Sequence, residues 1–598
     1  MSSATERIAA LRDSMKRNGV DAFLIPTEDF HGSEYVGEHF KCRRYITGFT
    51  GSAGTALIGQ DYAMLWTDGR YFLQAEKQLE GSGVTLQKMG EKGVPTIEEF
   101  ISKTLTSGQV LGCDGRTLTD REAEKLNSLL GEVGASLKAD ADLVGEIWED
   151  RPPICANPVW ELDTFYTGKD RREKLEDIRT ALKENCADHL LITSLDDIAW
   201  TLNLRGDDVE CNPVFMSYLL ISENDACLYA QEAAFSEELT ARLASDGVKI
   251  VPYFRIYEDV ALLPEGSCLW IDPDKVNYAL VLKTPKTVRM FRKTNPTILA
   301  KAVKNPTEAE HMRKAHMTDA VAVIRFIRWI KEHAGEDGVT ELSAAEKLEE
   351  FRRAGEHYVG PSFEPIVGYA HHAAIIHYSA TEQTDIPIDA KGMVLVDSGG
   401  QYLEGTTDIT RTIVLGETTR EEKEFFTRVL RGNLALAAAY FKQGCCGMNF
   451  DYLARAPLWE IGEDYNHGTG HGVGFLLNVH EGPNSFHYRS YPGRRPDTEL
   501  IPGMVTSDEP GYYLPGKFGI RHENLLLCTA AEERPCGQFL KFEPLTLVPF
   551  DLEAVLPDQM SERERELLNA YHQLVYDKIS PLLNEEEQAW LKEATRKI

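Results

Sequence analysis

Two carboxylates in the second half of the chain stand where two neighbouring strands would bring them together. The apolar run 394–396 ends at Asp397, and after a glycine-containing turn the β-branched segment 407–412 carries Asp408. Strands joined in this way can form a hairpin-like pair whose two carboxylates face the same side. Such carboxylates repel each other unless a proton or a cation lies between them. The pair therefore predicts a metal site.

Further metal-ligand residues follow in short glycine-rich segments. Alternating glycines surround His467 and His471, and His480 comes shortly afterwards. Glycines let a backbone pass close to a site while histidines point into it. Glu509 and Glu523 then complete a set of four carboxylates and one imidazole, which suits two divalent ions better than a sulfur-rich structural zinc site does. We expect Mn²⁺, with Co²⁺ or Zn²⁺ as alternatives.

Other catalytic motifs do not explain these residues. The glycines of 468–474 are not part of a GxxxxGK[ST] motif or a strand-linked GxGxxG motif, which argues against phosphate binding. His480 and His522 each precede a glutamate, but neither has a second histidine four residues on, so no HExxH zinc motif is present.

The region before the ligands contains two copies of one pattern. In each copy an amphipathic helix runs into an apolar strand, and two more strand-like runs follow. This alternation predicts two α/β domains of one design. The first copy comprises 7–18, 21–25, 54–58 and 63–66, and the second comprises 172–185, 189–193, 217–222 and 226–230.

A helix start marks the beginning of the catalytic region. Asn305 is a good N-cap, Pro306 suits the first turn, and Glu308 stands where a capping box needs an acid. The helical pattern continues through His333. A proline-rich stretch at 151–158 is the earlier linker. We therefore expect three domains at 1–157, 158–302 and 303–598, the last with a charged helical C-terminal appendage from about 535.

Composition excludes several classes of protein. The net charge of −30 over 598 residues argues against nucleic-acid and anionic membrane partners. The N-terminal segment lacks the apolar core of a signal peptide, and no apolar run approaches membrane-helix length. Eleven cysteines without a CxxC pair indicate reduced, mostly buried thiols. We expect a cytoplasmic protein.

Several segments resemble a known family. The ligand motifs look like those of the M24 "pita-bread" metallopeptidases. RYITGFTGSAGT at 44–55, WTDGRYF at 66–72 and FEPLTLVP at 542–549 resemble its long, three-domain Xaa-Pro aminopeptidases. The likeness covers essentially the whole chain. It implies two creatinase-like α/β domains, a pita-bread catalytic domain with a curved antiparallel sheet backed by helices, and a homodimer built through the catalytic domains.

The resemblance also implies a role for each ligand. Asp408 and Glu523 would bridge two metal ions, Asp397 would hold one of them, and His471 and Glu509 would hold the other.

Catalytic residues follow in the same way. Glu509 would move protons, and His377 or His480 would donate hydrogen bonds to the developing oxyanion. His467 and Arg521 would bind substrate or support the ligands. Two plainer interpretations stay open, because His377 could be a core histidine on an apolar strand and His467 could be purely structural. His522 departs from the aliphatic residue that is usual in the family.

The activity implied is removal of an N-terminal residue that precedes proline. A prolidase, which acts on Xaa-Pro dipeptides only, is the nearest alternative, and the doubled N-terminal module with the C-terminal appendage argues against it. A non-catalytic peptide-binding protein of the same fold is a further alternative. Relatives of that kind have lost metal ligands, whereas all five positions are filled here.

Overall fold

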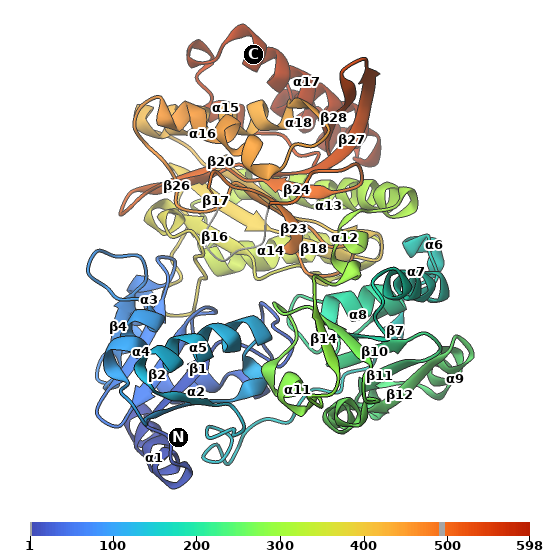
Figure 1. Cartoon of the computed structure of the whole chain (residues 1–598). Helices are drawn as coiled ribbons and strands as arrows, with labels where there is room; N and C mark the ends of the chain where they lie inside the picture. The colour runs from blue at the N-terminus through green and yellow to red at the C-terminus, as the bar shows by residue number, and fades with distance from the viewer. Residues whose placement is uncertain (1–2, 490–496) are drawn as a thin grey trace. The chain divides into compact units, whose positions relative to one another are not determined.

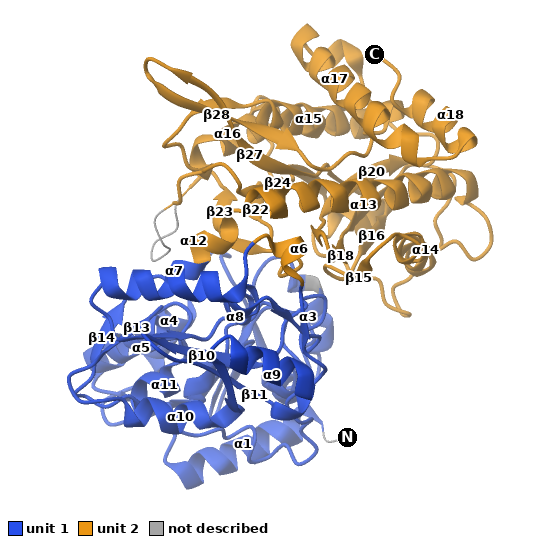
Figure 2. Cartoon of the chain, turned by 90° about the vertical axis from the view of Figure 1, so that its right-hand side faces the viewer, with its two compact units in different colours: residues 1–162, 169–297 blue, residues 163–168, 298–598 orange. Residues whose placement is uncertain are grey.

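The computed structural model describes residues 3–489 and 497–598, which form two units. The first unit comprises Met1–Leu162 with Lys169–Thr297, and the second comprises Asp163–Gly168 with Ile298–Ile598 (Figure 2). The short segment 163–168 therefore belongs to the second unit although the first unit flanks it on both sides.

Two mixed sheets of six strands build the first unit, and they share one strand order. In each, a first strand pairs antiparallel with the second and parallel with the fifth. The predicted repeat is confirmed, with strand ends within one residue of expectation. The first sheet is β4 (Thr85–Lys88), β3 (Ala63–Thr67), β2 (Thr55–Gly59), β1 (Ala22–Pro26), β5 (Val110–Cys113) and β6 (Ser136–Lys138). The second is β12 (Val248–Pro252), β11 (Ala226–Ala230), β10 (Ser217–Ser222), β8 (His189–Ile192), β13 (Cys268–Ile271) and β14 (Arg289–Arg292).

A capped helix leads into each first strand. Helix α1 (Ala4–Asn18) precedes β1 and starts at a Ser3–Glu6 capping box. Helix α7 (Arg171–Glu184) precedes β8 and starts at an Asp170 capping box. Local capping therefore sets the start of both helices.

Helix α13 (Pro306–His333) runs through the second unit and begins as the sequence predicts. The Asn305 side chain accepts the N–H groups of Thr307 and Glu308, and the Glu308 carboxylate accepts the N–H of Asn305. Asn305 Nδ2 also donates to Thr167 O at 2.8 Å, which ties α6 (Thr164–Thr167) to this helix start.

Antiparallel sheets, backed by α13 and three further helices, form the catalytic region (Figure 1). The helices are α14 (Glu341–Arg353), α15 (Arg420–Ala437) and α16 (Asp451–Trp459). One sheet is β16 (Ile366–Tyr369), β17 (Met393–Ser398) and β20 (Ile409–Val414), another is β15 (Tyr358–Pro361), β18 (Gly400–Tyr402) and β19 (Gly405–Thr406), and β25 (Gly511–Leu514) pairs with β26 (Phe518–Arg521). The largest is β21 (Tyr440–Lys442), β28 (Gly537–Pro544), β27 (Asn524–Arg534), β24 (Val505–Asp508), β22 (Gly470–Gly472) and β23 (Glu481–Phe486).

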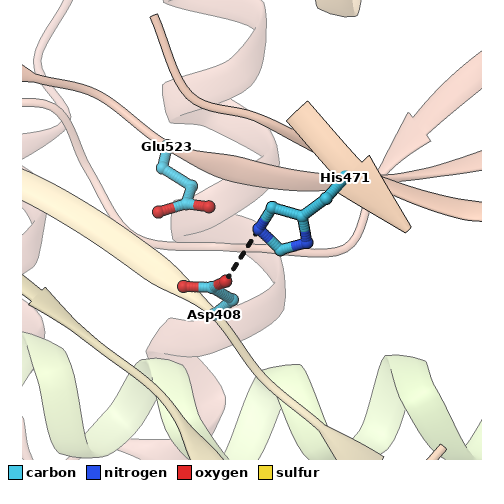
Figure 3. A group of neighbouring side chains, drawn as sticks. All are labelled: Asp408, His471 and Glu523. Atoms are coloured by element: carbon cyan, nitrogen blue, oxygen red, sulfur yellow. Dashed lines mark ion pairs between the residues drawn. The ribbon is translucent and has the colours of Figure 1, made fainter. Parts of the chain in front are cut away.

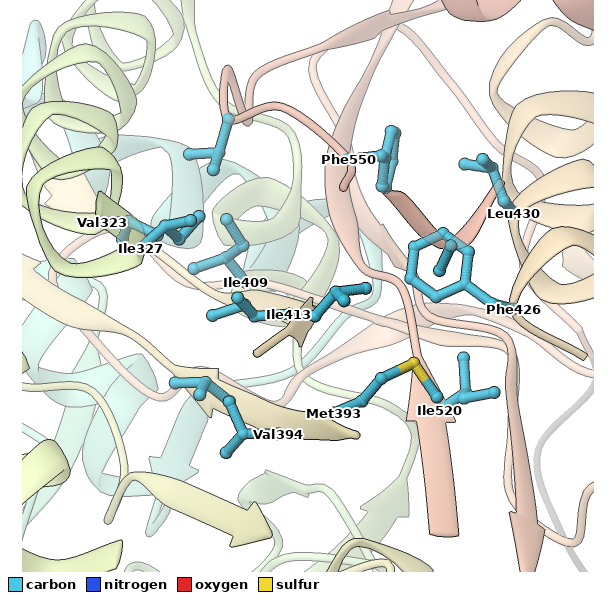
Figure 4. Close-up of a cluster of buried hydrophobic side chains, with 14 of the residues drawn as sticks. Val323, Ile327, Met393, Val394, Ile409, Ile413, Phe426, Leu430, Ile520 and Phe550 are labelled. Carbon is cyan, nitrogen blue, oxygen red and sulfur yellow. The ribbon is translucent and has the colours of Figure 1, made fainter. Parts of the chain in front are cut away.

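The main apolar core of this unit joins its sheets to its helices. Ile409 and Ile413 of β20 contact the same buried cluster as Val323 of α13 and Phe426 of α15 (Figure 4). The C-terminal helices α17 (Glu562–Ile579) and α18 (Glu585–Ala594) also place buried side chains, such as Val575, in this cluster. The C-terminal segment is therefore an integral part of the core that supports β20.

The structure also bears on the expectations about membrane helices and cysteines. No helix in the described residues is long and apolar enough to span a bilayer. All eleven cysteines lie in the described residues and are free thiols, but only Cys113, Cys268 and Cys528 are buried. The expectation of mostly buried thiols is therefore wrong, because the other cysteines lie at partly or fully exposed positions.

Candidate metal centre

The two aspartates lie on neighbouring antiparallel strands. Asp397 is on β17 and faces Thr410 of β20 in the strand register, while Asp408 immediately precedes β20. The predicted hairpin-like arrangement is confirmed. Glycines 399 and 405 lie in the connection between the strands, and Gly405 adopts a φ of 140° that few other residues tolerate.

Three of the predicted ligands converge on one point. Asp408, His471 and Glu523 each offer a donor atom, and these atoms all lie within 4.8 Å of one another (Figure 3). His471 Nε2 is 3.5 Å from Asp408 Oδ2 and 3.5 Å from Glu509 Oε1. The other ring nitrogen, Nδ1, lies 2.9 Å from Gly472 O. A carbonyl at that nitrogen fixes the tautomer in which Nε2 carries the lone pair that a metal ion would bind.

The electrostatics of this cluster call for a cation. Burial and the neighbouring Asp397 charge raise the pKa of Asp408 well above its ordinary value. Burial and the Asp408 charge do the same to the pKa of Glu523, and burial raises the pKa of Glu509 to about 7. Buried carboxylates this close are costly unless protons or metal ions offset their charge.

One orphaned atom supports the same conclusion. Asp397 Oδ1 is buried and has no hydrogen-bond partner among the described residues, whereas Arg521 Nη2 donates to Oδ2 of the same carboxylate. A buried oxygen without a donor is a ready ligand position. Four carboxylates and one imidazole fit hard or borderline divalent ions.

Hydroxyl groups that the sequence motifs do not reveal support the carboxylates. Thr410 Oγ1 donates to Glu523 Oε2 at 2.8 Å and accepts from Arg521 Nε at 3.2 Å. Arg521 Nη1 donates to Tyr513 OH at 2.7 Å. One signal for Thr410 was available, because it lies two residues beyond Asp408 in the same extended segment. Tyr513 gave none.

Two of the predicted histidines contact residues of the site. The His480 ring meets the His471 ring edge to face, with centroids 4.4 Å apart. His467 Nε2 lies 2.9 Å from Tyr513 OH, and burial with the nearby Arg521 charge lowers the pKa of His467 to about 3. His467 is therefore neutral at physiological pH and contacts the same tyrosine as Arg521.

His377 does not lie on a strand. It is exposed, in a turn that follows the 3₁₀ segment η6 (Ala370–Ala374). The interpretation as a core histidine on an apolar strand is therefore wrong. The chain turns at Ala370, whose φ of 52° is incompatible with an extended strand. His377 still acts electrostatically on His467, whose pKa it helps to lower.

His522, which departs from the usual family pattern, serves as a packing residue. It is fully buried, and its ring meets Phe426 edge to face at 4.3 Å and Phe550 at 5.4 Å. Burial lowers its pKa to about 3, so it packs as a neutral ring. The imidazole thus fills an apolar position beside Glu523.

Known families match the chain along its length. The model of metallopeptidase family M24 matches residues 310–530, and that of the C-terminal region of this peptidase family matches 538–598. Two creatinase/prolidase N-terminal domain models match 7–146 and 150–308. Fold and site thus define a metallopeptidase with a doubled creatinase-like N-terminal module.

A curated relative matches nearly the whole chain. The chain is 39% identical over 607 residues to "Xaa-Pro aminopeptidase 1" of Dictyostelium discoideum, covering 98% of this chain and 96% of that protein. It therefore belongs to metallopeptidase family M24.

Two solved structures give the structural comparison. The X-prolyl aminopeptidase from Caenorhabditis elegans, described as a cytosolic enzyme with a di-nuclear active site, matches with a TM-score of 0.93 and 33% identity over 100% of both chains. An Xaa-Pro dipeptidase from Bacillus anthracis matches with a TM-score of 0.51 and 26% identity, covering 64% of this chain and 99% of that one.

Proposed function

We propose that this chain is a two-metal aminopeptidase that removes an N-terminal residue preceding proline. The observation that carries the proposal is the extent of similarity. The relatives named for this activity align over essentially the whole chain, whereas the Xaa-Pro dipeptidase aligns over 64% of it. The prolidase alternative leaves about a third of the chain without a counterpart in that structure.

Five residues would hold the metal ions. Asp408 and Glu523 would be shared by both ions, Asp397 would hold one ion, and His471 and Glu509 would hold the other. Mn²⁺ is the ion that we propose. When bound, two divalent ions supply Lewis acidity, which polarises the scissile carbonyl and makes water a nucleophile near neutral pH. The orphaned Asp397 oxygen and the raised pKa values of Asp408 and Glu523 support this assignment.

The chain's own residues then handle protons and charge. Glu509 takes a proton from the attacking water and passes it to the departing proline nitrogen. His480 or His377 donates a hydrogen bond to the carbonyl oxygen as negative charge develops on it. Arg521, which bonds to the Asp397 carboxylate, orients that ligand and does not react.

Hydrolysis of two peptides tests the proposal. Protein stripped with a chelator is assayed on Arg-Pro-Pro and on Ala-Pro, with and without added Mn²⁺. We expect metal-dependent release of arginine with little action on Ala-Pro. Cleavage confined to Ala-Pro would identify a prolidase. No hydrolysis of either peptide by metal-loaded protein would favour the non-catalytic peptide-binding alternative.

We further propose that the protein is a homodimer built through the second unit. Three exposed aromatic rings support this proposal: Trp459 lies 5.9 Å from both Tyr452 and Tyr488, measured between ring centroids. Exposed aromatic clusters are typical of protein interfaces. Sedimentation velocity should give a dimer for the wild type and a monomer for Tyr452→Glu. Leu582→Glu, at another exposed apolar residue, is the control and should stay dimeric.

Domain limits and location complete the proposal. We infer domains at 1–157, 158–302 and 303–598, with a C-terminal part from about 535, and the four separate family-model matches support this division. A cytoplasmic location is supported by the description of the similar Caenorhabditis elegans enzyme.

A further inference from the structure

We propose that two buried lysines, Lys301 and Lys304, position His480 by holding the neighbouring Glu481. They would be positioning residues for the reaction, without touching substrate or metal. This inference rests on the proposed function, because it gives His480 a role in that reaction.

The carboxylate of Glu481 is clamped between the two lysines. Lys301 Nζ donates to Oε2 at 2.7 Å, and Lys304 Nζ donates to Oε1 at 2.6 Å. The three side chains are only 7%, 1% and 2% exposed for Lys301, Lys304 and Glu481. Each carboxylate oxygen therefore has its own buried ammonium, and the side chain has one well-defined position.

Lys304 makes a second contact that closes a loop. Its Nζ also donates to Val473 O at 2.5 Å. Val473 lies two residues after His471, and Glu481 directly follows His480. A single ammonium group thus holds both ends of the loop that runs from the metal-ligand histidine to His480.

The two ends of the loop meet closely enough to exclude a side chain. Gly472 faces Glu481 in the register of β22 and β23. A Cβ at Gly472 would lie 2.2 Å from Glu481 O, so only glycine allows this approach. A small shift of Glu481 therefore moves His480 relative to His471. The centroids of the two imidazole rings are 4.4 Å apart.

Lys304 is itself anchored to the sheet that carries the site. Lys304 N donates to Gly503 O at 2.9 Å, and Val303 forms a β-bridge with Met504. Gly503 has a φ of +100°, and a Cβ there would lie 2.6 Å from Lys304 O. Residues 503 and 504 lead directly into β24, after which Glu509 follows. The clamp therefore fixes the position of His480 relative to β24, the strand that leads to the proposed ligand Glu509.

Stability alone is a poor explanation for this cluster. Two ammonium groups and one carboxylate pay a large desolvation cost when they are buried, and apolar replacements of similar volume are often as stable. What charged groups add is a fixed geometry, through short and directional hydrogen bonds. The place where that geometry matters is the neighbouring residue, His480.

Epistasis between Lys304 and His480 tests the inference in the full-length, Mn²⁺-loaded protein. We expect Lys304→Met to lower kcat/KM on Arg-Pro-Pro by up to about 100-fold, the cost of a misplacement near 1 Å, with metal content unchanged. In a His480→Ala background the same substitution should have no further effect. Equal losses in both backgrounds would overturn the positioning role. A wild-type protein that does not hydrolyse Arg-Pro-Pro would instead contradict the proposed function.

Two more variants sharpen the result. Lys301→Met leaves Lys304 to hold both Val473 and Glu481, so a smaller loss with the same dependence on His480 is expected even if Lys304→Met does not fold. Lys314→Met is the control for loss of a lysine–glutamate pair, because Lys314, which is half-exposed, also pairs with a buried glutamate, Glu404, at 2.7 Å. It should leave kcat/KM unchanged, and a loss equal to that of Lys301→Met would contradict the inference.

Discussion

The carboxylates of the metal centre are buried close to one another, and hydrogen bonds from neighbouring side chains hold them there. Asp408 and Glu523 are buried beside other carboxylates, which raises their pKa values. Thr410 donates a hydrogen bond to Glu523, and Arg521 donates one to the neighbouring Asp397. Arg521 brings one positive charge to four carboxylates, so most of the negative charge remains. The remaining negative charge is what a pair of divalent ions would offset.

Glu523→Gln tests the ligand role most directly. An amide has the same shape and still accepts from Thr410, but it cannot bridge two cations as a carboxylate does. We expect loss of at least one bound ion and a fall in activity beyond the roughly 10- to 100-fold that loss of a supporting residue costs. Elemental analysis and peptide hydrolysis measure both effects. Glu543→Gln, at a half-exposed partner of Arg313, is the control.

A carboxylate of the first unit, Glu28, predicts a separate pH effect on stability. Burial, with the charges of Glu122 and Asp29, raises the pKa of Glu28 from 4.5 to about 8. The folded state therefore binds a proton more tightly than the unfolded state, and stability is lost as pH rises from about 4.5 towards 8.

Glu28→Gln should remove this loss. The variant should match the wild type near pH 4.5 and melt about 2–4 °C higher at pH 8. Calorimetry at the two pH values measures the difference. An equal shift at both pH values would show that the effect is unrelated to ionisation.

Sequence motifs predict residues better than they predict contacts. The motifs around His471, Glu509 and Glu523 were identifiable because glycine and proline neighbours set them apart, and the structure brings these side chains together. Their metal-binding roles stay predictions. Thr410 was missed although it lies two residues beyond Asp408, and Tyr513 was missed because a hydroxyl that supports a ligand has no motif of its own.

Elements around the site pack through glycines. A Cβ at Gly519 of β26 would lie 1.8 Å from Ala373 O, and one at Gly368 of β16 would lie 2.9 Å from Ala373 Cα. The η6 segment therefore lies directly on two strand backbones. The buried Glu341 carboxylate fixes the turn beyond η6, because it accepts from Tyr378 OH at 2.7 Å. His377 precedes that tyrosine.

Gly519→Ala should disturb this packing. The added methyl group cannot be accommodated against a backbone carbonyl, so we expect a loss of about 1–3 kcal/mol in the free energy of unfolding. Activity should fall as well, because the turn that carries His377 would shift. Gly360→Ala, where a Cβ meets nothing within 4 Å, is the control. Identical melting and activity for both variants would contradict the packing argument.

Helix starts were predictable, whereas this turn was not. Asn305, Pro306 and Glu308 report the start of α13 through contacts within four residues. The apolar residues Ile375 and Ile376 suggest a strand at His377, but the direction of the chain is set by tertiary contacts with Gly519 and Glu341. Local pattern cannot report such contacts.

At the scale of the whole molecule, metal should act on one unit only. All five proposed ligands lie in the second unit, and the one group of clustered metal-ligand side chains in the described residues also lies there. A ligand that binds only folded protein stabilises it by roughly 2.7 kcal/mol at about 100 times its Kd.

Calorimetry of the full chain with and without Mn²⁺ tests this prediction. The transition of the second unit should move to higher temperature and that of the first should stay in place. Fragment 1–297, scanned alone, identifies the metal-insensitive transition. A shift of both transitions by the same amount would contradict assignment of the metal to the second unit.

The sequence repeat predicts the architecture of the first unit, because each sheet is built from contiguous patterns. The assignment of 163–168 to the second unit was not predictable, since Thr164–Thr167 is held there by Asn305, far along the chain. Sequence patterns indicate which segments form elements, and only long-range contacts indicate which unit an element joins.

This interleaving has a consequence for synthesis on the ribosome. Chains emerge N-terminus first, and domains generally fold as units while synthesis continues. When residue 297 has been made, the first unit is complete, but 163–168 still has no partner until Asn305 emerges. The same order governs any attempt to divide the gene. A break after residue 297 leaves the six residues on the upstream product, so the downstream product can only be completed by a segment supplied in trans.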